Sequence, residues 1–204
     1  MRLLKRWSAI MESPWAYALW QAPFANAKFA PIQRHNDLGS VHRVLDVGCG
    51  PGTNTKFFAH TDYVGIDINE SYVERGRRRF GRTFIQADVC DYTPAPDQRY
   101  DFVLINSLMH HLDDVTSDRI LNTLRRVITP DGHLHVLDLI LPDDPSIARY
   151  LAENDRGNYP RPFETWNELL VRYFEPVVVE RFSLGLMGLD LWRMLYFKGR
   201  PRAG

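Results

Sequence analysis

Residues 44–55 read VLDVGCGPGTNT, and this stretch decides the fold of the chain. Its first four residues are mostly apolar and β-branched, which is typical of a strand buried on both faces of a parallel sheet. Three glycines follow at alternate positions, Gly48, Gly50 and Gly52. Glycine adopts positive φ without strain and lets a ligand approach the backbone closely, so this turn predicts a binding site for a small molecule.

The three residues after the glycines are all of types that cap helix N-termini. We therefore expect a helix over residues 53–60, with its unpaired N–H groups facing the turn. Asp46 would repel a pyrophosphate, and the spacing Gly-x-Gly-x-Gly differs from the Gly-x-Gly-x-x-Gly of dinucleotide sites. S-adenosylmethionine (SAM) carries an ammonium and a sulfonium group that fit this carboxylate. Its own carboxylate fits the helix N-terminus.

Residues 44–55 resemble the first motif of the class I SAM-dependent methyltransferases, hydrophobic-Asp-hydrophobic-Gly-x-Gly-x-Gly. Two further short apolar stretches, residues 63–68 and 84–89, each carry an acid near their end, Asp67 and Asp88. Asp67 lies near the offset of ~20 residues at which Rossmann-type folds place a ribose-binding acid. Three acids at successive strand ends make the resemblance much more specific than the glycine turn alone.

The resemblance implies individual roles around the cofactor. Asp67 would bind the ribose hydroxyls, and Asp88 would bind the adenine amino group. Ile68 and Val89 would cover the faces of the adenine ring, and Asn106 would contact the methionine moiety. The cofactor-binding residues implied in this way are Asp46, Gly48, Cys49, Gly50, Gly52, Thr53, Asn54, Asp67, Ile68, Asp88, Val89, Asn106 and Ser107.

A His-His-Leu segment follows residues 100–106, which have the pattern of a strand. This resembles the fourth motif in the branch of the family that methylates many small molecules and lipid-like quinones. His110 or His111 would face the acceptor as a general base or orient the nucleophile, because the unperturbed pKa of histidine is ~6.5. Alternatively, the pair only caps or packs. A metal site shared with Asp113 and Asp138 is not expected, because adjacent side chains of an extended chain point to opposite sides.

Strands and helices alternate from residue 41 onward, which predicts an α/β fold with a mostly parallel sheet and helices on both faces. The expected strands cover residues 42–47, 62–67, 83–87, 100–106 and 133–140. The expected helices cover residues 53–60, 70–80 and 115–128. The resemblance implies a Rossmann-like sheet of seven strands with an antiparallel C-terminal strand, completed by residues 177–182 and 191–197. Ligands bind beyond the carboxyl ends of the strands in such sheets.

Residues 1–40 precede this pattern and are rich in aromatic side chains. We expect a helix to begin at Ser13-Pro14, an N-cap followed by proline at the first helical position. Three roles are open for the segment: a lid over cofactor and acceptor, packing against the sheet, or a helix on a membrane surface. We therefore divide the chain into an N-terminal helical lid or cap, residues 1–40, and a SAM-binding methyltransferase domain, residues 41–204.

Residues 141–162 are the least regular segment of the predicted domain. In related enzymes the insertion after the fifth strand builds the acceptor pocket, although an ordinary surface loop is the alternative. The candidates for substrate contact are Tyr150, Asn154, Arg156, Tyr159 and Arg161. The apolar and flexible stretch 185–189 could border a hydrophobic acceptor pocket.

The composition excludes several classes of protein. Hydrophobic residues make up 45% and charged residues 25% of the 204 residues, so neither disorder nor a membrane span is indicated. The 25 Lys and Arg residues balance the 25 Asp and Glu residues, which argues against a broad nucleic-acid-binding face. Two cysteines form no disulfide framework and favour a reducing compartment, so we expect a cytoplasmic protein. We expect no nucleic-acid partner and no stable membrane insertion.

These features predict a SAM-dependent methyltransferase that modifies an O, C or N atom of a small, apolar or aromatic molecule. The protein would mainly align donor and acceptor in a dry pocket. One alternative is a nicotinamide-dependent oxidoreductase, which shares the strand, the glycine turn and the ribose acid. Another is a non-catalytic SAM-binding module, because a fold does not fix a function. The sequence indicates neither the acceptor nor the oligomeric state.

Overall fold

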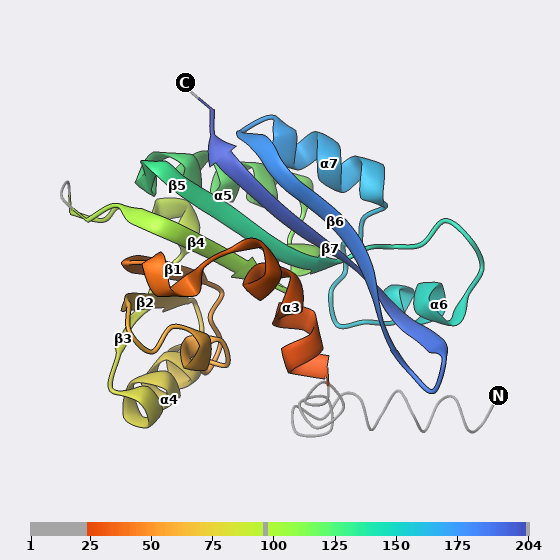
Figure 1. The fold of residues 1–204 in the computed structure, drawn as a ribbon, viewed down its shortest axis with the longest axis horizontal. Helices are drawn as coiled ribbons and strands as arrows, with labels where there is room; N and C mark the ends of the chain where they lie inside the picture. The colour runs from red at the N-terminus through yellow and green to blue at the C-terminus, as the bar shows by residue number, and fades with distance from the viewer. Residues whose placement is uncertain (1–23, 96–97, 203–204) are drawn as a thin grey trace.

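The computed structural model describes residues 24–95 and 98–202 (Figure 1). Within these residues the chain forms one sheet of seven strands in the order β3-β2-β1-β4-β5-β7-β6. The strands are β1 (Arg43–Val47), β2 (Asp62–Asp67), β3 (Thr83–Gln86), β4 (Tyr100–Asn106), β5 (Ile128–Leu139), β6 (Phe174–Leu186) and β7 (Leu189–Pro201). The first five are parallel to one another, and β7 is antiparallel to both β5 and β6. This arrangement confirms the predicted Rossmann-like fold.

Helices cover both faces of the sheet (Figure 1). They are α3 (Ala25–His35), α4 (Glu70–Phe80), α5 (Asp114–Val127), α6 (Ile147–Glu153) and α7 (Phe163–Val171). Buried side chains of α3 and α4 share one core cluster, and those of α5 and α7 share another. Strand β1 contributes Leu45 and Val47 to the second cluster and Val44 to the first, as the alternation of side chains along a strand requires.

The prediction of a helix over residues 53–60 is wrong. The structure has only a short 3₁₀ turn there, Thr55–Phe57. The amide of Asn54 points inward to the buried carboxylate of Asp46 instead of capping a helix. The sequence-based argument that a helix N-terminus faces the ligand therefore has no basis in this structure.

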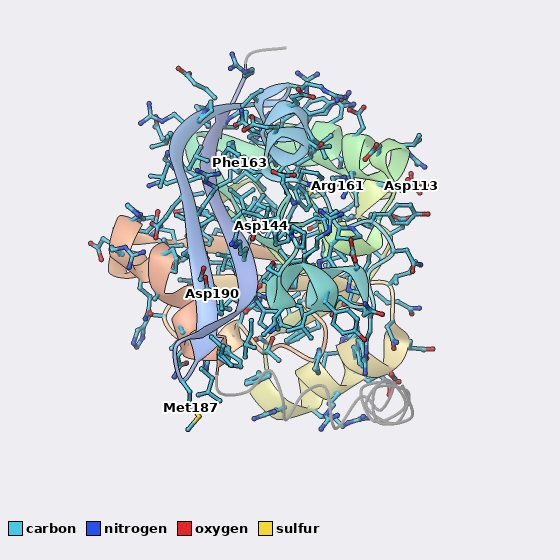
Figure 2. All side chains as sticks on the ribbon, turned by 90° about the vertical axis from the view of Figure 1, so that its right-hand side faces the viewer. Asp113, Asp144, Arg161, Phe163, Met187 and Asp190 are labelled. Atoms are coloured by element: carbon cyan, nitrogen blue, oxygen red, sulfur yellow. The ribbon has the colours of Figure 1, made fainter. Side chains whose placement is uncertain are left out.

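Other bounds differ less. Residues 62–67, 70–80 and 100–106 form the predicted elements with the predicted ends. Strand β5 begins at Ile128 and not at residue 133, because residues 129–132 continue the strand through a shift in its register with β4. Strands β6 and β7 are both longer than expected because they pair with each other along almost their whole length. Their hairpin ends at Met187, which is 95% exposed (Figure 2).

The described part of the N-terminal segment packs against the sheet. Phe29 and Ile32 of α3 are buried, and the ring of Phe29 stacks on that of Phe57 with centroids 3.8 Å apart. Residues 25–35 therefore contribute Phe29 and Ile32 to a core cluster of the domain. The helix expected to begin at Ser13-Pro14 lies outside the described residues. Among the described helices, none is both long enough and apolar enough to cross a membrane.

Candidate active site

The turn after β1 depends on its glycines. Gly48, Gly50 and Gly52 have φ values of 65°, 54° and 85°, which L side chains rarely adopt. A Cβ on Gly48 would lie 2.8 Å from a methyl carbon of Leu108. At Gly50, in contrast, no atom of the described residues lies within 4 Å of the position that a Cβ would take. The turn is therefore closely packed underneath and open at Gly50.

Asp67 lies against this turn from the end of β2. One carboxylate oxygen accepts the N–H of Gly50 at 2.8 Å, and the other accepts the N–H of Asn69 at 2.8 Å. Ile68, the next residue, is 72% exposed. The structure thus brings the predicted ribose acid, an exposed aliphatic side chain and the open glycine together at the carboxyl edge of the sheet.

Asp46 is fully buried and does not face that opening. Its carboxylate accepts a hydrogen bond from the hydroxyl of Tyr63 at 2.7 Å and two from the amide of Asn54 at 3.1 and 3.2 Å. Burial raises the pKa of Asp46 to about 6, although these hydrogen bonds oppose the shift. The carboxylate therefore contacts the site only indirectly, by holding the amide of Asn54. The side-chain oxygen of Asn54 in turn accepts a hydrogen bond from Asn106 at 2.9 Å.

Asn106 ends this chain of hydrogen bonds at the tip of β4. Its side-chain oxygen is buried and has no hydrogen-bond partner among the described residues. An unpaired buried acceptor is costly, so it is a natural partner for an ammonium group of a bound ligand. This orphaned oxygen and the open glycine both fit the methionine and ribose ends of SAM.

The remaining predicted cofactor residues differ in how accessible their side chains are to a ligand. Asp88 is exposed at the end of β3, and its carboxylate caps a short turn by accepting the N–H of Cys90 at 2.8 Å. Val89 is buried in the core, and Thr53 is exposed. Cys49 is 2% exposed, and burial raises the pKa of its thiol. Only the backbone of Cys49 is therefore available to a ligand at the turn.

The two histidines have different surroundings. His110 is 2% exposed and lies between two carboxylates: its Nδ1 is 2.5 Å from Asp138, and its Nε2 is 3.1 Å from Asp155. Burial disfavours the charged ring, but the carboxylates outweigh it and raise the pKa of His110 to about 9. His110 is therefore an imidazolium at neutral pH and is not placed to remove a proton from an acceptor.

His111 is exposed, and its ring lies beside that of His110, tilted by 40° with the centroids 4.1 Å apart. Partial burial and the neighbouring positive charge of His110 lower its pKa. Environments that separate the pKa values of a pair also separate their chemical roles. Of the two, His111 is the neutral ring that can accept a proton, and its catalytic role stays a prediction.

Arg161, a predicted substrate contact, has a structural role. It is 4% exposed, and its guanidinium donates to the carbonyl oxygens of Met109 and Leu112 at 3.0 and 2.7 Å. It also pairs with Asp114 at 2.8 Å. It fixes the segment between β4 and α5 (Figure 2) and is not available to an acidic substrate.

Two residues near the site had no signal in the sequence. The ammonium of Lys28, on α3, donates a hydrogen bond to the hydroxyl of Ser107, 79 residues further on. Asp155 lies in the irregular segment, between two residues that were candidates, and only the fold brings it to His110. No local pattern distinguishes either residue from a surface charge.

A small cavity of about 10 Å³, room for a single water, lies beside these side chains. Its lining residues are Lys28, Ser107, His110, Leu139, Asp155, Leu184, Trp192 and Met194. A larger hollow of about 610 Å³ lies between residues 90–95, Arg99 and α5, and none of the predicted site residues lines it. Within the described residues, no cluster of three or more His, Cys, Asp or Glu side chains could hold a metal ion.

Residues 44–132 match a family model described as a methyltransferase domain. Residues 44–132 therefore form a methyltransferase domain, and the sequence is similar to SAM-dependent methyltransferases. The cofactor of this family is SAM, and the observations at Gly50 and Asn106 fit it. The match covers β1 to β4, α5 and the start of β5, which are the elements that carry the predicted cofactor residues.

Two curated methyltransferases illustrate the similarity. The fatty-acid O-methyltransferase of Mycolicibacterium smegmatis is 37% identical over 103 residues, which cover 47% of this chain and 36% of that protein. The ubiquinone/menaquinone biosynthesis C-methyltransferase UbiE of Ectopseudomonas mendocina is 34% identical over 121 residues, 53% of this chain and 46% of that protein. The chain thus spans less than half the length of these relatives.

A solved methyltransferase shares the fold over most of its length. The N-methyltransferase NodS from Bradyrhizobium japonicum, in complex with S-adenosyl-L-homocysteine (SAH), superimposes with a TM-score of 0.71 at 18% identity. The alignment covers 89% of each chain. At this identity the likeness establishes the methyltransferase fold, and the acceptor has to be inferred from this chain's own residues.

Proposed function

We propose that the protein transfers the methyl group of SAM to an oxygen, carbon or nitrogen atom of a small molecule. The observation that carries the proposal is the meeting of three features at one edge of the sheet. These are the open glycine turn, the carboxylate of Asp67 and the unpaired oxygen of Asn106. A dinucleotide fits less well, because the turn has the spacing Gly-x-Gly-x-Gly and not Gly-x-Gly-x-x-Gly.

The residues that would hold the cofactor follow from their places. Asp67 would exchange its bond to Gly50 for the ribose hydroxyls, and Asn106 would accept from the amino group of the methionine moiety. Asp88 would reach the adenine amino group. The bound cofactor supplies an electrophilic methyl on a positively charged sulfur. The chain orients an acceptor and excludes water, which together can contribute ~7–11 kcal/mol.

An acceptor that loses a proton needs a base. His110 is held as a cation by Asp138 and Asp155, so His111 is the member of the pair that would take this role. The relatives' names include both O- and C-methyltransferases, which support methyl transfer without choosing the acceptor atom.

Calorimetric titration with SAM, SAH and NAD⁺ tests the cofactor. We expect SAM and SAH to bind and NAD⁺ to fail, and we expect Asp67→Ala to abolish measurable SAM binding. Asp62→Ala, at the opposite end of β2, is the matched control and should bind as the wild type does. Unchanged SAM affinity in Asp67→Ala would refute the ribose role. Transfer of a tritiated methyl group to an added acceptor then separates an enzyme from a non-catalytic SAM-binding module.

A further inference from the structure

We propose that Lys28 and Trp192 bind the acceptor through an oxyanion, and that this acceptor is a carboxylic acid with an apolar remainder, methylated on a carboxylate oxygen. The proposal rests on the proposed methyl-transfer function and specifies its substrate class. It assigns a binding role to α3, which precedes the methyltransferase sheet.

Lys28 lies at the end of the site where the methyl donor, SAM, is expected to bind. Its ammonium bonds to Ser107, the residue directly after Asn106 at the tip of β4. Ser107 has a φ of 55°, which is uncommon for a residue other than glycine and is maintained only where the surroundings fix it. This backbone conformation holds the hydroxyl of Ser107 between Asn106, a predicted cofactor residue, and the small cavity that Lys28 also lines.

Hydrogen-bond donors collect around this cavity. The indole N–H of Trp192 is buried, lines the cavity and has no hydrogen-bond partner in the described part of the chain. A buried indole N–H needs an acceptor, since the group can only donate. With the ammonium of Lys28 and the hydroxyl of Ser107, it forms a donor set that a carboxylate, with its several lone pairs, would satisfy.

The charges favour an anion for a second reason. Four charged side chains meet here, the cations Lys28 and His110 and the anions Asp138 and Asp155, and their charges sum to zero. Asp138 also accepts the N–H groups of Met109 and Leu139, at 2.9 and 2.8 Å. Bound SAM adds one positive charge through its sulfonium group. An anionic acceptor is attracted by the sulfonium charge beside this cluster, whereas an ammonium acceptor would add a second positive charge next to it.

The rest of the cavity wall is apolar and predicts the remainder of the acceptor. Leu139, Leu184 and Met194 line it beside the ring of Trp192. Because the cavity holds only about one water, the acceptor can enter only when the lysine side chain swings away from Ser107. The lysine stem is flexible enough for this movement.

The chemistry of a carboxylate matches the state of His110. A carboxylate oxygen forms a bond to the methyl carbon, the bond from that carbon to sulfur breaks, and its electron pair stays on sulfur. The products are a methyl ester and SAH, and no proton has to leave. A site whose buried histidine is held as a cation can therefore carry out this reaction, because the reaction needs no base. Because the carboxylate gives up charge during transfer, Lys28 stabilises the bound acid at least as much as the transition state, so its removal should act mainly on KM.

The test uses the full chain, tritiated SAM and matched acceptor sets. Octanoate, 1-octanol and octylamine form an aliphatic set, and benzoate, phenol and benzylamine form an aromatic one. We expect methyl transfer to the acids, recovered as base-labile esters. Lys28→Met should raise KM for the acid about tenfold or more with a smaller change in kcat, and Lys28→Arg should recover part of the loss.

Lys56→Met is the matched control, because Lys56 is an exposed lysine that bonds to Asn26 of α3 away from the cavity. Thermal unfolding with and without SAH verifies that each variant is folded and binds the cofactor. Transfer to the alcohols or amines in preference to the acids would overturn the acid proposal and leave the methyl-transfer function intact. Binding of SAM without transfer to either acid would also overturn it. Failure to bind SAM would instead refute the proposed function.

Discussion

Nδ1 of His110 lies 2.5 Å from a carboxylate oxygen of Asp138, and both side chains are almost completely buried. A buried ion pair of this kind depends on both partners, since the loss of one leaves an uncompensated charge. The second carboxylate at Nε2, from Asp155, makes the protonated ring more stable still. The pair joins the start of the segment after β4 to the end of β5, so its protonation contributes to the stability of the site.

Stability should therefore depend on pH through His110. The pKa is raised to about 9 in the folded protein, from ~6.5 in an unfolded chain, so the folded state holds an extra proton between these values. The stabilisation is complete below pH 6.5 and is lost as the pH rises through 9; the gap corresponds to roughly 3 kcal/mol. Urea unfolding of wild type and His110→Gln measures it. Their difference in unfolding free energy should shrink between pH 6 and 9.5, and a constant difference would contradict the assignment.

The glycine turn gives a second prediction. Gly48→Ala places a methyl group 2.8 Å from Leu108 in a left-handed backbone conformation, whereas Gly81 has a similar φ, 59°, and nothing described within 4 Å of its Cβ position. Gly81→Ala should cost about 1–2 kcal/mol of stability. Gly48→Ala should cost more and also weaken SAM binding. Urea unfolding and calorimetry measure both, and equal costs at the two glycines would show that the packing under the turn is unimportant.

Tyr63 tests the support beneath the cofactor site. Tyr63→Phe removes the 2.7 Å hydrogen bond to buried Asp46, so we expect a loss of ~1.5–3 kcal/mol of stability and weaker SAM binding through Asn54. Tyr173→Phe is the control, because its hydroxyl bonds to Asp118, which is more exposed and distant from the turn. It should lose less stability and keep its SAM affinity. If the Tyr63→Phe protein binds SAM with unchanged affinity, the hydrogen bonds from Tyr63 through Asp46 to Asn54 do not contribute to cofactor binding.

Lys28 predicts a pH dependence of acceptor binding. Burial lowers its pKa to about 8, against the opposing pull of Asp138 and Asp155. Above pH 8 the lysine loses its charge, so KM for an acid acceptor should rise by about tenfold per pH unit. His110 also faces this cavity but titrates near pH 9, and it does so in Lys28→Arg as well. Steady-state kinetics from pH 6.5 to 9 should show the break near 8 in wild type and not in Lys28→Arg.

Much of the sheet could be predicted because its signals are local. Residues 62–67 and 100–106 are short apolar stretches next to turn or polar residues, and they form β2 and β4 as expected. The glycine turn and Asp67 also come together as the motif predicts. In these places the residues that determine the structure are close together in the sequence.

The errors arise where a distant residue competes for a side chain. Asn54 is a good helix cap by type, but the buried carboxylate of Asp46 takes its amide, so the expected helix is only a short turn. His110 was one of two candidate bases, and nothing in the sequence indicated that Asp155, 45 residues further on, lies at its second nitrogen. No sequence pattern pointed to Lys28, because its partner Ser107 lies 79 residues further on.

Lys28 and Asp155 both lie outside residues 44–132, the segment shared with the methyltransferase family model. On the proposed roles, the acceptor site therefore includes residues from outside the segment that would bind the cofactor. If these roles hold, mutations outside residues 44–132 would change the acceptor while the affinity for the cofactor stays the same. Related proteins could thus keep the same cofactor site during evolution and still come to methylate different acceptors.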